Sequence, residues 1–326
     1  MDNLLEIRDL KMHFPVREGI LLRAAHYNKA VDGVSLQIKP GETLGLVGES
    51  GCGKSTLGRC IVNLYRPVSG DIFFQGKEIS RLSNKEVLPY RQNIQMIFQD
   101  PMESLNSRHT VGEILEEPLV IHRFGDSAAR KKRVRELLNI VGLPERSVSR
   151  FPFEFSGGQR QRIGIARAIA LNPKLIVCDE AVSALDVSIQ SQILNLLVDL
   201  QREFDLSYLF IAHDLAVVKH VSDRIAIMYL GRIVEVADSA VIHRDCRHPY
   251  PKSLLSAIPV PDPHRKPDRI VLEGDVPTPI DPPSGCSFHP RCPYREPRCQ
   301  SDEPVLRAPD DSTHRFSCHF DLNFTN

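Results

Sequence analysis

Short apolar runs recur along the chain and predict buried strands. They lie at residues 43–47, 94–99, 175–179 and 208–213. The run LIVCD at 175–179 is apolar up to its last residue, as expected for a strand buried on both faces of a parallel sheet. Residues 1–40 are also β-rich, because VDGVSLQI at 31–38 alternates apolar and polar positions. A hairpin is expected at 71–79, and two strands are expected around Gly231 within residues 225–237.

Helical periodicity separates these runs. A helix is expected from Lys54 to about Leu64, and the pattern from about 110 to 170 is mostly helical. Residues 128–143 are the plainest amphipathic stretch, and Gly142 and Pro144 predict its end. Residues 188–204 predict another long helix. Because strands and helices alternate, the sequence predicts an α/β fold with a parallel sheet.

The composition changes after about residue 245. Most of the 24 prolines lie beyond that point, at a density that long regular elements do not tolerate. We therefore expect a domain over residues 1–245 and a small, loop-rich domain over residues 246–326.

Charge and composition bear on the class of function and on where the protein is found. Lys plus Arg equal Asp plus Glu at 41 each, so net charge gives no argument for a nucleic-acid partner. The start, MDNLLEIRDL, lacks the pattern of a signal peptide, and no apolar run approaches the ~18–20 residues of a membrane helix. We expect a soluble cytoplasmic protein. Four of the eight cysteines crowd the last stretch, which in a cytosolic chain favours a metal over disulfides.

The segment GESGCGKST fits the phosphate-binding pattern G-x-x-x-x-G-K-[ST]. Backbone N–H groups must approach phosphate oxygens closely there, and the following helix presents its positive end to the anion. Lys54 should reach the β- and γ-phosphates of ATP, and the Ser55 hydroxyl should bind Mg²⁺. The predicted loop residues are Gly48, Glu49, Ser50, Gly51, Cys52, Gly53, Lys54, Ser55 and Thr56.

Two acids follow the strand at 175–179. Asp179 at the end of a strand, in a sheet that also carries a P-loop, is suited to orient Mg²⁺ through water. Glu180 could then polarise the attacking water. The alternative is a pair of helix-capping carboxylates, which the P-loop disfavours.

The segment FSGGQRQRIGIARAI at 155–169 resembles the signature of ATP-binding-cassette (ABC) ATPases. Ser156, Gly157, Gly158 and Gln159 open a basic helix, where free N–H groups could form a second phosphate cradle. The resemblance implies a head-to-tail dimer in which each signature covers the ATP of a second, related ATPase subunit. The alternative is an ordinary glycine-rich helix start.

Other motifs similar to those of the family follow in order. IFQDP resembles the Q-loop, which implies that Gln99 lies near Mg²⁺ and the attacking water. SALD resembles the D-loop, with Asp186 at the dimer seam, and IAHDL resembles the switch motif, with His213 on the γ-phosphate. Phe14 matches the aromatic residue that stacks on adenine, with Tyr27 as the alternative.

The chain departs from the family pattern at two positions. Phe155 stands where many cassettes have Leu, and we expect it only to pack. Ala181 stands where Pro usually follows the catalytic Glu, so Glu180 would be held less rigidly.

A closer resemblance is to ATPase subunits of bacterial dipeptide and oligopeptide permeases, especially the F-type subunit of the dipeptide importer. It is carried by the segments FQDPMESLNSR, EAVSALDVSIQSQILNLL, MYLGRIVE and RHPYPKSLLSAIPVPDP. It implies a P-loop ABC ATPase core with an antiparallel β subdomain, a helical subdomain at about 100–165 and the Cys-rich C-terminal domain. The implied partners are integral membrane permease subunits at the cytoplasmic face of the membrane and an extracytoplasmic substrate-binding protein. An importer of nickel or glutathione from the same family, and a soluble ABC protein of DNA repair or translation, remain as alternatives.

The last four cysteines have the spacing C-x5-C-x6-C-x18-C, at Cys286, Cys292, Cys299 and Cys318. Zinc sites usually contain C-x2–4-C pairs, which this pattern lacks, whereas a [4Fe–4S] cluster accepts looser spacing. Some members of the family resemble this pattern and carry such a cluster. A structural [4Fe–4S] cluster is therefore the first hypothesis, with Zn²⁺ and unmetallated thiols as alternatives. His289, His314 and His319 lie among the thiols and are expected to face solvent.

Overall fold

The computed structural model describes residues 3–18, 23–258, 270–308 and 313–325. The chain forms two compact units. The first unit comprises residues 1–38, 43–81 and 212–326, and the second comprises residues 39–42 and 82–211.

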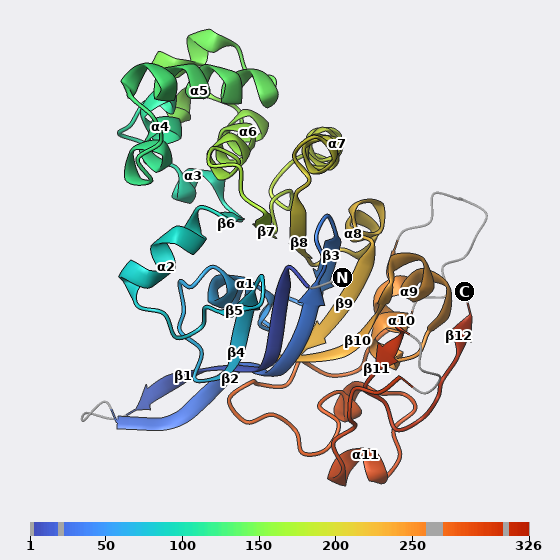
Figure 1. The fold of residues 1–326 in the computed structure, drawn as a ribbon. Helices are drawn as coiled ribbons and strands as arrows, with labels where there is room; N and C mark the ends of the chain where they lie inside the picture. Colours follow the sequence, from blue (N-terminus) through green and yellow to red (C-terminus); the bar gives the residue numbers. More distant parts are fainter. Residues whose placement is uncertain (1–2, 19–22, 259–269, 309–312, 326) are drawn as a thin grey trace, which may run out of the picture. The chain divides into compact units, whose positions relative to one another are not determined.

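An antiparallel sheet opens the first unit. Its strands are β1 (Leu5–Glu18), β2 (Arg23–Ile38), β4 (Ser69–Phe74) and β5 (Lys77–Glu78), in the order β2-β1-β4-β5. Figure 1 shows β1 and β2 side by side as a long ribbon, and Leu5 pairs with Ile38 on β2 and with Phe74 on β4. The predicted β-rich start and the hairpin at 71–79 are confirmed. Gln75 and Gly76 have φ of 51° and 75°, as a tight hairpin turn requires.

Four more strands of the first unit lie in the order β11-β10-β9-β3. They are β3 (Thr43–Val47), β9 (Arg224–Tyr229), β10 (Arg232–Asp238) and β11 (Arg315–Phe316). β3 runs parallel to β9, whereas β10 is antiparallel to both β9 and β11. Every residue of β3 is buried, so the apolar run at 43–47 is explained by burial on both faces. β11 attaches the C-terminal segment to β10.

The helices of the first unit are short. They are α1 (Lys54–Ile61), α8 (Leu215–Val221), α9 (Ser239–Asp245), α10 (Pro249–Ser256), α11 (Arg298–Ser301) and the 3-10 helix η3 (His289–Arg291), and strand β12 (Phe324–Thr325) closes the chain. α1 ends earlier than the expected Leu64. Asn63 takes a left-handed φ of 57° and its side-chain amide donates to the carbonyl of Ile79, which stops the helix.

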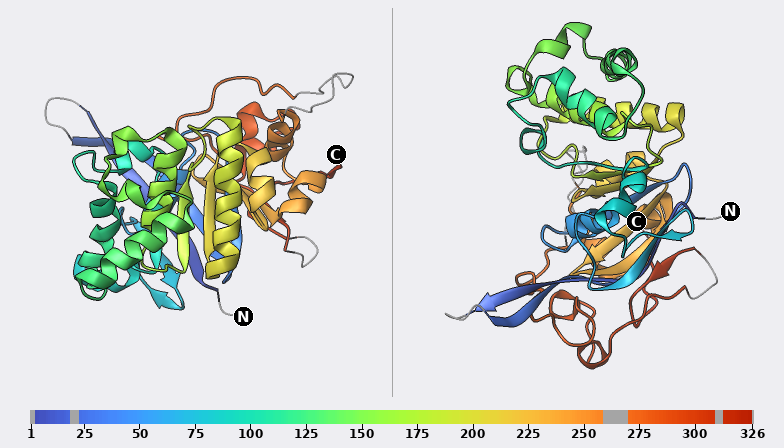
Figure 2. Two further views of the ribbon diagram at one scale, coloured as in Figure 1. Left: turned by 90° about the horizontal axis from the view of Figure 1, so that it is seen from above. Right: turned by 60° about the vertical axis from the view of Figure 1, so that its left-hand side comes forward.

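The second unit contains three parallel strands in the order β8-β7-β6. They are β6 (Ile94–Ile97), β7 (Leu175–Asp179) and β8 (Ser207–Ala212), which confirms the predicted parallel α/β pattern. Figure 2 shows the green helices of this unit as a group. The helices of the unit are α2 (Asn84–Arg91), α3 (Pro101–Ser104), α4 (Val111–Ile121), α5 (Ser127–Ile140), α6 (Gly157–Ala168) and α7 (Val187–Phe204), with 3-10 helices η1 (Glu145–Ser149) and η2 (Pro152–Glu154). α5 ends near Gly142, whose φ is 70°, as its sequence predicts. Among the helices of the described residues, none is long and apolar enough to cross a membrane.

Candidate nucleotide-binding site

The loop that joins β3 to α1 has room only for glycine at two positions. A Cβ on Gly53, whose φ is 107°, would lie 1.9 Å from the carbonyl oxygen of Ala30. A Cβ on Gly48 would lie 2.1 Å from the carbonyl oxygen of Met228. Because both contacts are with backbone, no side-chain movement would relieve them. The loop therefore keeps bare backbone at the start of α1, as a phosphate cradle requires.

Lys54 brings the positive charge of this loop. Its side chain is buried, and its Nζ donates to the carbonyl oxygens of Gly48 at 2.7 Å and Glu49 at 2.9 Å. Lys54 is the first residue of α1, and Ser55 and Thr56 follow in the first turn, at the end of a helix that carries positive partial charge. Burial raises the pKa of the neighbouring Cys52 thiol, so that side chain stays neutral. An ammonium and the positive end of a helix thus converge on one loop.

In the second unit, the structure brings together Gln99 and Glu180. The Gln99 Nε2 donates to the Glu180 Oε2 at 3.1 Å. Asp179 ends β7 and is 1% exposed, whereas Glu180 is half-buried with a φ of 48°. The Glu180 N–H donates to the carbonyl of Ile211 at 3.0 Å. The carboxylate of Glu180 therefore lies next to an amide that can orient it or a water molecule.

The segment 155–159 forms a capped helix start, also in the second unit. Ser156 is the N-cap of α6: its Oγ accepts from the Gln159 N–H, and the Gln159 Oε1 accepts from the Ser156 N–H. A Cβ on Gly158 would lie 2.4 Å from the Ile189 side chain, so glycine lets α6 approach α7 closely. Phe155 is 4% exposed and lies under the Arg150 guanidinium, which agrees with the expected packing role.

The structure also positions the remaining predicted residues within their own units. Asp186 is the exposed N-cap of α7 in the second unit. In the first unit, His213 is exposed just after β8. Phe14 on β1 is half-buried against Tyr65, with ring centroids 5.4 Å apart, whereas Tyr27 is 52% exposed. An adenine could stack on either aromatic side chain.

Known proteins match nearly the whole chain. Residues 31–183 match the family described as ABC transporter, and residues 234–299 match the family described as oligopeptide/dipeptide transporter, C-terminal region. The oligopeptide transport ATP-binding protein AppF of Bacillus subtilis is 51% identical over 98% of this chain and 97% of its own length. The oligopeptide transport ATP-binding protein OppF of Escherichia coli is also 51% identical, over 97% of this chain and 95% of its own length.

The chain belongs to the ABC transporter family. Solved structures agree with this assignment. The ATP-binding cassette MJ0796, a dimer bound to ADP and Pi, matches 72% of this ABC chain and 98% of its own with a TM-score of 0.65 and 29% identity. The cbiO1 protein of Clostridium perfringens, part of the ABC transporter complex cbiONQ, matches 74% of this chain and 91% of its own with a TM-score of 0.64 and 28% identity. The fold is therefore an ABC ATPase fold, as expected.

Sequence reasoning missed two residues of this ABC chain that contact the P-loop. The Glu49 N–H donates to the Tyr250 Oη at 2.8 Å, and the Arg291 guanidinium pairs with both carboxylate oxygens of Glu49, at 2.7 and 3.1 Å. Tyr250 lies in RHPYP, which carries the family resemblance, and Arg291 lies in HPRCP, which contains one of the clustered cysteines. Nothing in either segment indicates a contact with a loop about 200 residues away.

The four clustered cysteines line one small cavity of the first unit. Cys286, Cys292, Cys299 and Cys318 share it with His289 and His319. Burial raises the pKa of Cys286 and of Cys292 to about 11. Within the described residues, however, no group of three or more His, Cys, Asp or Glu side chains is arranged to hold a metal ion. The structure therefore gives the predicted cluster no support beyond the convergence of the thiols.

The prediction for the three histidines is wrong at His314. Its side chain is 12% exposed, and its Nε2 lies 2.7 Å from the fully buried Glu235 Oε1. His289 and His319 are half-buried, and each bonds a backbone carbonyl, that of Cys286 and that of Asp302. The C-terminal segment packs more tightly than its proline content suggests, because these polar side chains satisfy buried backbone and carboxylate groups.

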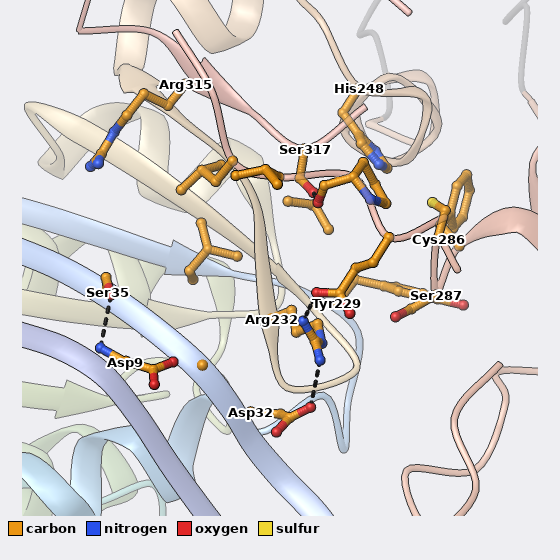
Figure 3. Close-up of a pocket in the computed structure, with 18 of the residues that line it drawn as sticks. Asp9, Asp32, Ser35, Tyr229, Arg232, His248, Cys286, Ser287, Arg315 and Ser317 are labelled. Atoms are coloured by element: carbon orange, nitrogen blue, oxygen red, sulfur yellow. Dashed lines mark hydrogen bonds and ion pairs between the residues drawn. The ribbon is translucent and has the colours of Figure 1, made fainter. Parts of the chain in front are cut away.

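A larger cavity of about 580 Å³ in the first unit shares His248, Cys286 and Phe288 with the cysteine cavity, and Figure 3 shows its lining. Arg232 reaches Asp32 at 2.7 Å and also pairs with Glu303, so it ties the N-terminal sheet to the C-terminal segment. The wall of this cavity mixes basic and acidic side chains, which are Lys11, Arg232 and Arg315 and Asp9, Asp32 and Glu303. P-loop residues do not line it, so it is separate from the phosphate cradle.

Proposed function

We propose that this chain is the ATP-binding and ATP-hydrolysing subunit that energises an ABC importer of oligopeptides or dipeptides. The observation that carries the cargo class is the match of residues 234–299 to the oligopeptide/dipeptide transporter C-terminal region, together with relatives of that name over nearly the full length. Neither nickel, nor glutathione, nor a soluble role in DNA repair or translation has comparable support.

The P-loop and the acids carry the chemistry in this proposal. The loop residues 48–56 bind the phosphates of ATP, with Ser55, Gln99 and Asp179 as the residues that would hold Mg²⁺. Glu180 polarises the attacking water, and Gln99 orients it. His213 contacts the γ-phosphate, and Phe14 stacks on the adenine.

The remaining residues act across a dimer. Ser156, Gly157, Gly158 and Gln159 cover the ATP bound by a second, homologous ATPase subunit, and Asp186 lies at the seam. The start of α6 supports this role, because the N–H groups of Gly157 and Gly158 lie in its first turn, while the Gln159 N–H is bonded to the Ser156 Oγ. ATP binding closes the dimer, and hydrolysis reopens it.

The wider assembly follows from the family. Integral membrane permease subunits would hold the chain at the cytoplasmic face of the membrane, and the segment after Gln99 in the helical subdomain (about 100–165) would grip a coupling helix. An extracytoplasmic substrate-binding protein would deliver the cargo. Residues 1–245 form the nucleotide-binding domain in this proposal, and residues 246–326 form the extension.

For the extension we retain a narrower proposal, that its four cysteines hold a structural [4Fe–4S] cluster rather than Zn²⁺. The support is the number and type of possible ligands around one cavity. Protein purified without oxygen should be brown and contain about four iron and four sulfide per chain. Replacing Cys299 by Ser should remove the brown colour, the iron and the sulfide. Colourless protein that contains zinc would contradict the cluster proposal and would leave the proposed ATPase function unaffected.

Transport in reconstituted vesicles tests the main proposal. The chain, its second ATPase subunit, the permease subunits and the binding protein should together accumulate a labelled oligopeptide when ATP is supplied. Unlabelled peptide should compete, whereas nickel and glutathione should not. Uptake of nickel or glutathione without peptide uptake would overturn the cargo assignment.

A further inference from the structure

The second residue of the P-loop is held at its backbone and its side chain by the C-terminal extension. The Glu49 N–H donates to Tyr250 on α10, and the Glu49 carboxylate accepts two hydrogen bonds from Arg291 on η3. The Arg291 side chain is 8% exposed and the Glu49 side chain is 27% exposed. Two parallel N–H···O bonds from one guanidinium are the strong, orientation-specific form of an ion pair.

A carboxylate at this place is unfavourable for nucleotide binding unless it is neutralised. The loop must attract a triphosphate that carries about four negative charges, and like charges at short range repel, most strongly where water is partly excluded. Lys54 is already needed for the phosphates, and its ammonium bonds the backbone carbonyls of Gly48 and Glu49. The cation that lies against the Glu49 carboxylate is instead the Arg291 guanidinium.

We propose that Arg291 neutralises Glu49 and thereby sets the affinity of the P-loop for nucleotide, which makes the extension part of the ATP site. The proposal rests on the function proposed above. Arg291 acts through Glu49 and is a positioning residue, not a catalytic one.

The surroundings of Arg291 hold it at the loop. Phe288, one residue before η3, packs its ring against Tyr229 and Tyr250, with centroids 5.3 and 5.4 Å away. All three rings are buried, and Tyr250 is the residue that also bonds Glu49. One aromatic cluster thus fixes both contacts of the extension with the P-loop. Cys292 directly follows Arg291. A well-ordered four-cysteine segment therefore helps to fix the position of the Arg291 guanidinium.

A double-mutant cycle on the full chain tests the proposal. The affinities for ADP and for adenylyl imidodiphosphate, a non-hydrolysable ATP analogue, would be measured by calorimetry with Mg²⁺. Arg291→Ala should weaken binding of the analogue about tenfold, within the range of coupling between charged neighbours. The loss should be smaller for ADP, because ADP carries less charge. Arg291→Ala combined with Glu49→Gln should recover the affinity of Glu49→Gln alone, because no carboxylate then remains to be neutralised.

Two further variants separate charge from folding. Arg298→Ala removes an exposed arginine of the same extension that pairs with Asp302 at 3.4 Å, and it should leave nucleotide affinity unchanged. Arg291→Lys keeps the charge and should lose less affinity than an Arg291→Ala variant that is folded.

The inference is wrong if Arg291→Ala binds the analogue as tightly as the unmodified chain, if Glu49→Gln does not rescue it, or if Arg291→Lys loses as much as Arg291→Ala. Those results would leave the proposed function intact, since Lys54→Ala tests that separately. Failure of the unmodified chain to bind nucleotide would instead count against the proposed function.

Discussion

Glu180 combines a strained backbone with a defined side-chain partner. Its φ of 48° is uncommon for a residue with a long side chain, and its N–H is anchored on the Ile211 carbonyl. The residue that follows is Ala181, which is 2% exposed, where the family pattern has Pro. The hydrogen bond from Gln99 supplies an additional constraint on the carboxylate. A residue in this conformation is suited to hold one functional group in a fixed place.

We expect Glu180→Gln to keep ATP binding and to lower the ATPase rate of the assembled transporter by about 100-fold or more, because the amide cannot accept a proton from water. The variant should also remain a closed dimer in ATP, visible by size-exclusion chromatography. Glu203→Gln, at an exposed position of α7, is the matched control and should hydrolyse ATP normally. A normal ATPase rate for Glu180→Gln would show that Glu180 does not polarise the attacking water.

At this scale the sequence predicts what is local. Gly48, Gly53 and Lys54 belong to one short motif and Ser156 to another, and the residue types and spacing of each motif identify it, although the backbone atoms that require glycine at 48 and 53 belong to Met228 and Ala30. Arg291 could not be predicted, because it lies 242 residues from Glu49 and its partner is chosen by packing. The buried position of His314 could not be predicted for the same reason, because its partner Glu235 is distant in the sequence and buried in β10.

The starts of α6 and α2 are built in the same way. In α6 the Ser156 Oγ accepts from the Gln159 N–H at 3.4 Å, and in α2 the Ser83 Oγ accepts from the Glu86 N–H, also at 3.4 Å. In both helices the third residue bonds back to the backbone of the cap. The two elements therefore gain similar stability from their caps, while only α6 carries the signature segment.

This pair separates capping from catalysis. Ser156→Ala and Ser83→Ala should each cost about 1 kcal/mol of unfolding free energy, measured by denaturant titration. Only Ser156→Ala should lower the ATPase rate of the assembled transporter, by about tenfold, because it alone removes a hydroxyl from the second phosphate cradle. Equal ATPase rates for the two variants would contradict the assignment of the signature.

Element positions follow the apolar patterns closely, whereas some element ends do not. β3 and β7 occupy the predicted runs because full burial requires continuous apolar residues. The end of α1 differs because the Asn63 side chain bonds to the carbonyl of Ile79, which follows strand β5 later in the chain. The side-chain arrangement around the four cysteines could not be read from their spacing, since spacing does not fix how the loops between them turn.

At the scale of the whole molecule, the extension is integrated into the first unit through buried groups. His248 is 1% exposed, and its Nδ1 accepts from the Tyr250 N–H at the start of α10. Burial lowers the pKa of His248 from 6.5 to about 3. The neutral imidazole is thus the folded form, and it belongs to the aromatic cluster that reaches Glu49.

A lowered pKa of this kind contributes stability that is complete above pH 6.5 and is lost as the pH falls toward 3. The unfolding free energy should therefore decrease by about 1 kcal/mol per pH unit below pH 6 through this group. Denaturant unfolding at pH 7, 6 and 5, about the ordinary pKa of histidine, would measure how the unfolding free energy changes with pH. His248→Asn keeps an acceptor for the Tyr250 N–H and should show a flatter dependence. An unchanged slope in that variant would assign the pH dependence to other groups.

The affinity of the purified chain for MgATP, with and without Lys54→Ala, tests the account most directly. The ammonium of Lys54 and the bare backbone of its loop are what should hold the triphosphate, so the unmodified chain should bind and the variant should lose affinity by about 100-fold or more. Circular dichroism would show that the variant is folded. Equal affinities in two folded proteins, or no binding by either, would contradict the assignment of this loop as the nucleotide site.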